Sequence, residues 1–302
     1  MLNNSEWKPV RKAVFPVAGM GTRFLPATKV MPKEMLPLVD RPLIQHAMEE
    51  AKAAGIEEFI FVTGRQKEML EEHFDYQPEL QRTLEARGKT DLLEKVRESE
   101  LSESQLFLTR QARPLGLGHA IWCARKLVGN EPFAVLLPDD VILSDTPCMK
   151  QMIHQYNQTG GNMLAVMDVP LEDTSKYGVL DVESDDGTIA KVKGMVEKPD
   201  PEDAPSTLSV IGRYILQPQI FDQLSKFETG AGGEIQLTDA IAKFIGNQPL
   251  NGFRYKGQRY DCGSREGFIE ANIAFSLQDP VIGESVRNMV QKYAQQVQTK
   301  VA

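Results

Sequence analysis

The stretch AVFPVAGMGTRFLPATKVMPKEMLP, residues 13–37, decides the fold because it joins a buried strand to a long loop. Its first five residues are apolar and predict a central strand of a sheet. Gly19 and Gly21 follow, and two glycines at this place let backbone N–H groups approach a phosphate or a base closely. Taken alone, the glycines fit a plain turn equally well.

Two familiar nucleotide-binding motifs do not fit this loop. A dinucleotide fingerprint would need a third glycine at position 24, where the chain has Phe24. A P-loop would need a Gly-Lys-Ser/Thr triplet, which the residues around Arg23 do not supply. The loop then continues through prolines and lysines to residue 37, and a loop of this length is uncommon unless it is functional.

Working outward, the pattern predicts a strand, a helix and a strand in a right-handed unit of a parallel sheet. The helix has an apolar face at residues 43–51, with Asp40 as its cap, Pro42 in its first turn and Gly55 at its end, and residues 59–63 form the next strand. Further strands at 105–109 and 133–137 and a helix after Gly118 continue the alternation. The charged stretch 78–100 predicts a solvated helical insertion.

The second half of the chain is richer in strands, which we expect at 163–169, 177–182, 189–196, 209–216 and 253–260. A helix is expected to begin near Glu234, and a helical region from about Ser264. The predicted fold class is α/β, with a Rossmann-like, mixed, mainly parallel sheet flanked by helices that binds ligands at the carboxyl ends of its strands. The predicted domains are a catalytic domain, 1–263, and a C-terminal helical appendage, 264–302.

Composition excludes several classes of function. The chain has 34 Lys and Arg against 42 Asp and Glu, a net charge of −8, which argues against nucleic acid and membrane partners. The N-terminal residues contain no apolar signal region, and no apolar run is long enough to span a bilayer, so the expected compartment is the cytoplasm. The three cysteines suggest neither a disulfide framework nor a zinc site.

Further motifs along the chain support a functional interpretation of the loop. The run from residue 16 to residue 37 resembles the nucleotide-binding signature of the sugar nucleotidylyltransferase family, and within it the bacterial UDP-glucose pyrophosphorylase branch. The resemblance continues through almost the whole chain, in blocks that keep their order. These blocks are Gln111 with GLGHA (116–120), LPDD (137–140), YGV (177–179), VEKP (196–199), GAGGEIQLTD (230–239) and YDCG (260–263).

The resemblance implies a reaction between two polyanions. UTP and glucose 1-phosphate would give UDP-glucose and pyrophosphate, with Mg²⁺ as the cofactor and no covalent intermediate, in a homodimer or homotetramer. The phosphate nucleophile is already ionised, so catalysis reduces to charge neutralisation and alignment. The residues that the resemblance assigns to catalysis are Arg23, Lys33, Asp139 and Lys198, and those that it assigns to the nucleotide are Ala18, Gly19, Gly21, Thr22, Glu34, Gln111, Gly116 and Asp139.

The residues implied for binding the sugar phosphate and the metal lie after the glycine-rich loop in the sequence. The implied sugar-phosphate residues are Gly178, Glu197, Lys198, Gly212 and Glu234. Magnesium commonly takes one or two carboxylates together with substrate phosphates, and Asp139 and Asp261 stand near two predicted strand ends. Asp140 follows Asp139 directly, so the pair leaves open which of the two is the ligand, although the family pattern favours Asp139.

Three other functions compete with this interpretation. A regulatory protein that kept the fold would have lost a charged catalytic position, yet Arg23, Lys33, Asp139, Lys198 and Asp261 are all present. A nicotinamide-dependent dehydrogenase is disfavoured by Phe24 in the fingerprint. A neighbouring enzyme that uses dTTP or another sugar 1-phosphate is the nearest alternative, and the sequence leaves it open.

Overall fold

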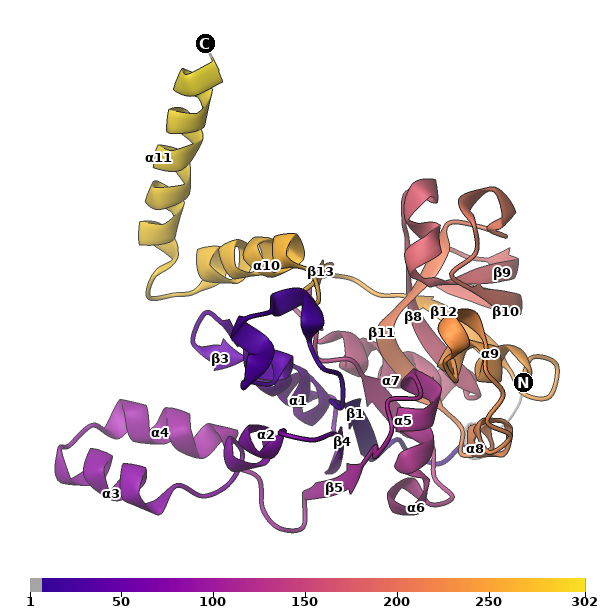
Figure 1. The fold of residues 1–302 in the computed structure, drawn as a ribbon, viewed down its shortest axis with the longest axis horizontal. Helices are drawn as coiled ribbons and strands as arrows, with labels where there is room; N and C mark the ends of the chain where they lie inside the picture. The colour runs from indigo at the N-terminus through magenta and orange to yellow at the C-terminus, as the bar shows by residue number, and fades with distance from the viewer. Residues whose placement is uncertain (1–6, 302) are drawn as a thin grey trace.

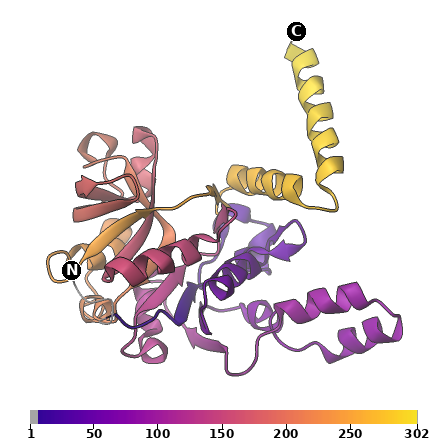
Figure 2. The ribbon, with the colours of Figure 1, turned by 180° about the vertical axis from the view of Figure 1, so that it is seen from behind.

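The computed structural model describes residues 7–301, which build a nine-stranded mixed sheet (Figures 1 and 2). The strand order is β5-β4-β1-β6-β11-β8-β12-β10-β9. The strands are β1 (Lys12–Pro16), β4 (Glu58–Thr63), β5 (Leu106–Arg110), β6 (Phe133–Leu136), β8 (Asn162–Asp168), β9 (Gly178–Asp185), β10 (Ile189–Glu197), β11 (Leu208–Leu216) and β12 (Leu250–Arg254). The α/β fold is as predicted.

The direction of the strands differs from the prediction in one half of the sheet. Strands β5, β4, β1 and β6 are mutually parallel, as the alternating pattern of the N-terminal half indicates. Beyond β6 the neighbours are antiparallel except for the pair β8 and β12. The sheet is therefore mixed, and mainly parallel only in the part that carries the glycine-rich loop.

Helices cover both faces of the sheet because the strands are buried on both sides. Val14 of β1 belongs to one hydrophobic core, and its neighbours Ala13 and Phe15 belong to the other, as the two-residue period of a strand requires. One core takes the apolar faces of α5 (Leu117–Cys123), α6 (Arg125–Val128), α8 (Ile220–Leu224) and α9 (Leu237–Ala242). The other takes those of α1 (Leu43–Ala53), α2 (Glu68–Glu72) and α7 (Cys148–Thr159).

Several predicted boundaries are wrong. The residue before α1 is Pro42, and no side chain caps the helix. Asp40 lies before that position, where it pairs with Lys95. The helix expected after Gly118 begins at Leu117, and the helix expected near Glu234 begins at Leu237. The predicted strand 253–260 is two strands, because the chain turns at Gly257, where φ is +143°.

The two parts of that predicted strand join different sheets. The first is β12, and the second is β13 (Gln258–Asp261), which pairs with β7 (Asp140–Leu143). A further small hairpin consists of β2 (Pro37–Leu38) and β3 (Arg41–Pro42). The charged stretch 78–100 is a pair of helices, α3 (Pro78–Ala86) and α4 (Thr90–Ser99), which extends away from the sheet, as Figure 1 shows.

The chain ends in two helices after β13. Ser264 caps α10 (Arg265–Gln278), and this helix packs on β13 and β2 and adds Ala271 to a third small core. The following helix, α11 (Gly283–Val301), leaves the body of the molecule beyond α10 (Figures 1 and 2). The predicted division into 1–263 and 264–302 stays a prediction, and residues 1–6 and 302 lie outside the described residues. Within the described part, no helix combines the length and the apolar character needed to cross a membrane.

Candidate active site

The glycine-rich loop is held above the carboxyl end of β1 by short turns and one side-chain bond. It contains three 3-10 turns, Thr22–Phe24, Ala27–Lys29 and Lys33–Met35. The Thr28 hydroxyl donates to the carbonyl of Gly21 at 2.6 Å. Gly21 has φ +65°, and a Cβ there would lie 2.9 Å from Cβ of Lys33. Glycine at this position therefore allows the two ends of the loop to meet.

A cavity of about 500 Å³ lies beside the loop, at the carboxyl ends of β1, β4 and β5. Three of the predicted nucleotide residues on the loop, Ala18, Gly19 and Thr22, line it together with Gln111. The side-chain nitrogen of Gln111 donates to the carbonyl of Gly116 at 3.0 Å. The structure thus brings most of the predicted base-contacting residues into one place.

Charged side chains converge at the other end of the loop. Lys33 Nζ donates to Asp139 Oδ2 at 2.5 Å. Although burial alone would raise the pKa of Asp139, the adjacent Lys33 ammonium holds that pKa below its ordinary value. The pKa of Lys33 is raised in turn, because Asp139 and Glu34 outweigh the opposing effect of burial. Both groups are therefore charged near neutral pH.

Asp261 and Arg23 face the same point as Asp139. A Cβ placed on Gly263 would lie 2.9 Å from Asp261 Oδ1, 3.0 Å from Asp139 Oδ2 and 3.5 Å from Nη1 of Arg23. The two carboxylate oxygens are each within 3.0 Å of one point, so they are separated by less than twice that distance. The backbone N–H of Cys262 also donates to the carbonyl of Asp139, at 2.7 Å, and fixes the two strand ends to one another.

Asp140 points to different partners. Its Oδ2 accepts from the backbone N–H of Gly212 at 2.7 Å, and its Oδ1 accepts from Arg259 Nε at 2.8 Å and from a second nitrogen of the same guanidinium. Arg259 donates onward to the hydroxyl of Tyr177 at 2.8 Å. Asp140 is thus a buried structural carboxylate with both oxygens bonded inside the protein, which favours Asp139 as the carboxylate available to a metal.

Glu34 lies beneath the loop in a buried ion pair with a lysine, an alternative that the sequence left open for this carboxylate without identifying which lysine. It is 1% exposed, and its Oε2 accepts from Lys67 Nζ at 2.6 Å, while its Oε1 has no hydrogen-bond partner within residues 7–301. Burial raises the pKa of Glu34 against the opposing effect of Lys67 and Lys33. Lys67 also lines the cavity of about 500 Å³ beside the loop, which we call the base cavity because most of the predicted base-contacting residues line it. The pair therefore ties the loop to the segment after β4. Lys67 differs from an ordinary lysine in being buried. The burial of a single side chain cannot be inferred from the sequence, so sequence reasoning missed this residue.

The predicted sugar-phosphate residues lie mostly around the end of β10. A Cβ on Gly178 would lie 3.3 Å from Oε2 of Glu197, and Glu197 Oε1 is 3.5 Å from Lys198 Nζ. Lys198 has φ +49°, a conformation that residues other than glycine rarely adopt and that Val39, Gln66 and Phe227 share in this chain. The side chain of Lys198 is 47% exposed, which leaves its ammonium accessible.

Two predicted sugar residues have other neighbours. The backbone of Gly212 bonds within the protein, through its N–H to Asp140 and through its carbonyl to Leu137 and Arg213. Glu234 is exposed and lies against the base end of the site, where its Cβ would be 2.8 Å from a Cβ on Gly116. The structure therefore brings Glu234 next to a residue predicted for the nucleotide.

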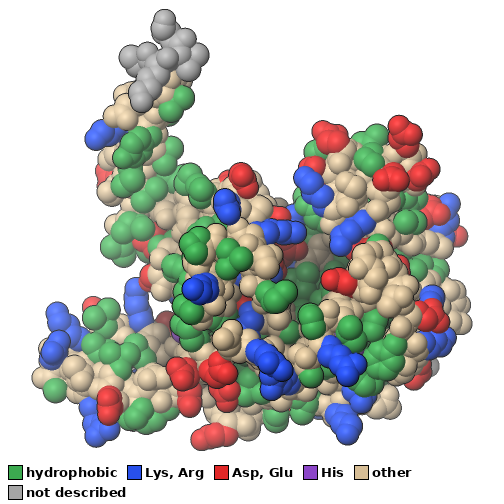
Figure 3. Space-filling view, in the orientation of Figure 1, with side chains coloured by type: hydrophobic (Ala, Val, Ile, Leu, Met, Phe, Trp, Pro, Cys, Tyr) green, Lys and Arg blue, Asp and Glu red, His purple; other side chains and the backbone are tan. Residues whose placement is uncertain are grey.

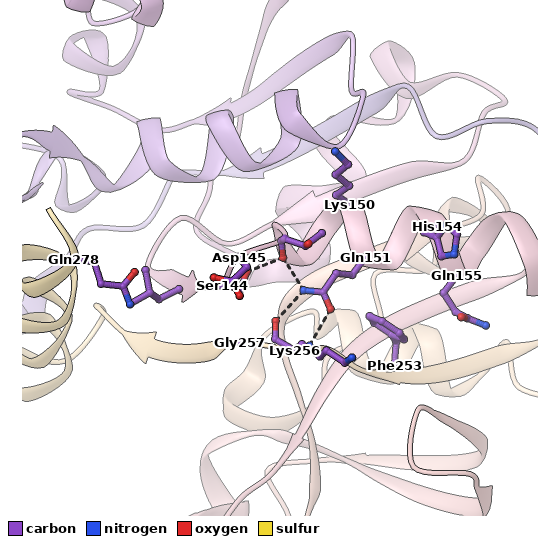
Figure 4. A pocket seen from close by; sticks show the side chains of 12 residues that line it. Ser144, Asp145, Lys150, Gln151, His154, Gln155, Phe253, Lys256, Gly257 and Gln278 are labelled. Atoms are coloured by element: carbon purple, nitrogen blue, oxygen red, sulfur yellow. Dashed lines mark hydrogen bonds between the residues drawn. The ribbon is translucent and has the colours of Figure 1, made fainter. Parts of the chain in front are cut away.

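The surface is hollowed between the loop side and the β9–β10 side of the molecule, and both basic and acidic side chains lie around this hollow (Figure 3). A separate cavity of about 730 Å³ lies elsewhere, between the start of α7, the turn at Gly257 and the end of α10 (Figure 4). Gln151 closes part of it by bonding to the backbones of Thr146 and Lys256. None of the predicted site residues lines that second cavity.

Known proteins match the chain over most of its length. The nucleotidyl transferase family model matches residues 12–276. A UTP–glucose-1-phosphate uridylyltransferase from Komagataeibacter xylinus is 57% identical over 258 residues, which is 85% of this chain and 91% of that protein. A UDP-glucose pyrophosphorylase solved in complex with UDP-glucose has a TM-score of 0.80 at 45% identity, covering 89% of this chain and 100% of that one. A UTP-bound enzyme of the same name from Acinetobacter baumannii has a TM-score of 0.86 at 40% identity, covering 93% of this chain and 99% of that one.

With its loop, its paired aspartates and its cations assembled on a common fold, the chain belongs to the nucleotidyl transferase family, in the group of the UTP–glucose-1-phosphate uridylyltransferases.

Proposed function

We propose that this protein transfers the uridylyl group of UTP to glucose 1-phosphate and releases UDP-glucose and pyrophosphate. The observation that carries the proposal is the meeting of Lys33, Asp139, Asp261 and Arg23 at one point of the site. The base cavity with Gln111 lies on one side, and Glu197 and Lys198 lie at the end of β10. The relatives named for this reaction, and those solved with UTP and with UDP-glucose, support the same substrates.

The reaction depends on the alignment of two phosphates more than on the activation of a nucleophile. An oxygen of the sugar phosphate attacks the α-phosphorus of UTP, the bond from that phosphorus to the β-phosphate oxygen breaks, and pyrophosphate leaves with the bonding electrons. The nucleophile is ionised near neutral pH, so no side chain needs to take a proton from it. Lys33 and Arg23 would balance the charge on the departing pyrophosphate, and Lys198 would hold the incoming phosphate.

Asp139 and Asp261 fit the requirements of a magnesium site. Magnesium prefers oxygen ligands and usually binds through one or two carboxylates together with substrate phosphates. The lowered pKa of Asp139 keeps this carboxylate charged, and both carboxylates face one point. When bound, the ion would supply charge neutralisation between the two phosphates.

The substrate pair can be tested directly. We expect the combination of UTP and glucose 1-phosphate to give the highest kcat/KM in a matrix of nucleoside triphosphates and sugar 1-phosphates, with pyrophosphate release as the readout. A preference for dTTP or ATP would contradict the proposal and favour a neighbouring activity. A nicotinamide cofactor should show no saturable binding. Saturable binding of such a cofactor would favour the dehydrogenase alternative.

We also propose that the enzyme, which we expect in the cytoplasm, is a homodimer or homotetramer held in part by α11. This helix packs on α10 and carries an apolar stripe made of Val286, Met289, Tyr293 and Val297, spaced so that they share one face. Met289, Tyr293 and Val297 are 51%, 59% and 64% exposed. An apolar stripe of this kind on a projecting helix is typical of a contact with another chain, and a second copy is the partner that every preparation contains.

The stripe predicts a change of oligomeric state. We expect the double variant Met289→Glu, Tyr293→Glu to have a lower mass than the parent protein in light scattering coupled to size exclusion, because two buried charges would oppose association. Gln291→Glu, on the opposite face of α11, is the matched control and should leave the mass unchanged. A parent protein that is already monomeric at micromolar concentration would contradict the proposal.

A further inference from the structure

The amide of Gln111 has a defined orientation, which follows from its two neighbours. Its terminal nitrogen lies 3.0 Å from the carbonyl oxygen of Gly116 and 3.1 Å from Nδ1 of His119. A carbonyl oxygen only accepts hydrogen bonds, so the atom that faces Gly116 has to be the amide nitrogen. Since that nitrogen only donates, its contact with His119 is a hydrogen bond in the neutral tautomer whose Nδ1 is unprotonated and whose Nε2 carries the proton.

The surroundings of His119 favour this neutral ring. Burial lowers the pKa of His119, against the opposing effect of the Arg113 backbone carbonyl. The other ring nitrogen, Nε2, carries the proton and lies 3.9 Å from the sulfur of Cys123. Trp122 stacks on the ring at 5.9 Å between centroids, and Phe227 lies 6.1 Å away, so aromatic side chains hold the imidazole in place.

The consequence concerns what Gln111 offers to a ligand. Both hydrogens of its amide nitrogen point to partners inside the protein, Gly116 and His119. Its oxygen has no hydrogen bond among the described residues, and Gln111 lines the base cavity. The side chain therefore presents an acceptor and no donor to the cavity.

An acceptor distinguishes pyrimidines by their N3 atom. Uracil and thymine carry a hydrogen on N3, whereas N3 of cytosine is itself an acceptor. If cytosine bound in the same pose, the lone pair on its N3 would face the lone pair on the Gln111 oxygen, and the two would repel. On the basis of the proposed function, we propose that His119 is a positioning residue for base selection. By accepting from Gln111, it holds the glutamine oxygen toward the base and so selects UTP over CTP, with no effect on the choice between UTP and dTTP.

The test uses the ratio of nucleotides. We expect His119→Leu to lower the preference for UTP over CTP by at least about tenfold, because the amide of Gln111 then loses one of the two contacts that fix its orientation and is held by Gly116 alone. The loss should appear in KM for UTP and in the affinity for CTP measured by competition, with a smaller change in kcat. His119→Asn retains an acceptor near the position of Nδ1 and should restore the preference. The ratio of UTP to dTTP should stay the same in both variants.

Trp122→Leu is the matched control, because it disturbs the same aromatic cluster without touching Gln111. Circular dichroism establishes that each variant is folded, and calorimetric titration of UTP and CTP gives the binding ratio independently of turnover. An unchanged ratio in His119→Leu, or an equal loss in Trp122→Leu or His119→Asn, would overturn the role of His119. Wild-type protein that binds UTP but shows no turnover with glucose 1-phosphate would instead contradict the proposed function alone.

Discussion

Asp139→Asn and Asp261→Asn are each expected to lower kcat by at least about a hundredfold, because each removes one of the two charges that face a common point in the site. Two phosphate-bearing substrates repel one another in a cleft of low dielectric constant, so the loss of a metal-binding charge affects both neutralisation and alignment. The magnesium concentration that gives half-maximal rate should rise in both variants. Steady-state kinetics over a range of magnesium concentrations measures both effects.

Asp140→Asn provides the contrast, because Asp140 bonds to Arg259 and to the backbone of Gly212. Removing its charge leaves the largely buried guanidinium of Arg259 without its ion-pair partner, a change that typically costs about 3–5 kcal/mol of unfolding free energy. Thermal unfolding should therefore distinguish Asp140→Asn, which is destabilised, from the other two variants, which should keep their fold. Near-normal rates and magnesium dependence in both Asp139→Asn and Asp261→Asn would show that the metal assignment is wrong, as would a substrate complex with the ion on Asp140.

The N-terminal half of the fold could be predicted from sequence because local signals agree there. Apolar runs predicted β1, β4, β5 and β6 to within two residues at each end, and the intervening helices follow from spacing. In the second half of the chain, the strands are determined less by local sequence signals. The residues of β12 and β13 form one continuous strand-like run, and only the turn at Gly257 separates them. A single glycine in such a run does not by itself indicate that the chain changes sheets.

The candidate site divides in a similar way. Loop residues and strand-end carboxylates could be proposed from motifs, because each motif is contiguous. The partners that hold those residues could not, because they come from distant segments: Lys67 pairs with Glu34, and Arg259 pairs with Asp140. Such pairings depend on tertiary packing, and a lone lysine or arginine has no sequence signal that separates it from a surface residue.

Lys198 provides a direct test of the sugar-phosphate end of the candidate site. We expect Lys198→Ala to lower kcat/KM for glucose 1-phosphate by roughly 30- to 1,000-fold, about 2–4 kcal/mol, because it removes a charge-assisted contact that substrate would cover.

The affinity of Lys198→Ala for UTP should change little, since Gln111, Ala18 and Gly19 at the base cavity are untouched. Lys193→Ala is the matched control, because Lys193 lies on the same strand, β10, and pairs with Asp181 at the surface. The exposed ammonium of Lys198 makes a purely structural role a poor explanation, because an exposed charge adds little stability. If Lys198→Ala kept normal kinetics for glucose 1-phosphate, Lys198 would not belong to the site.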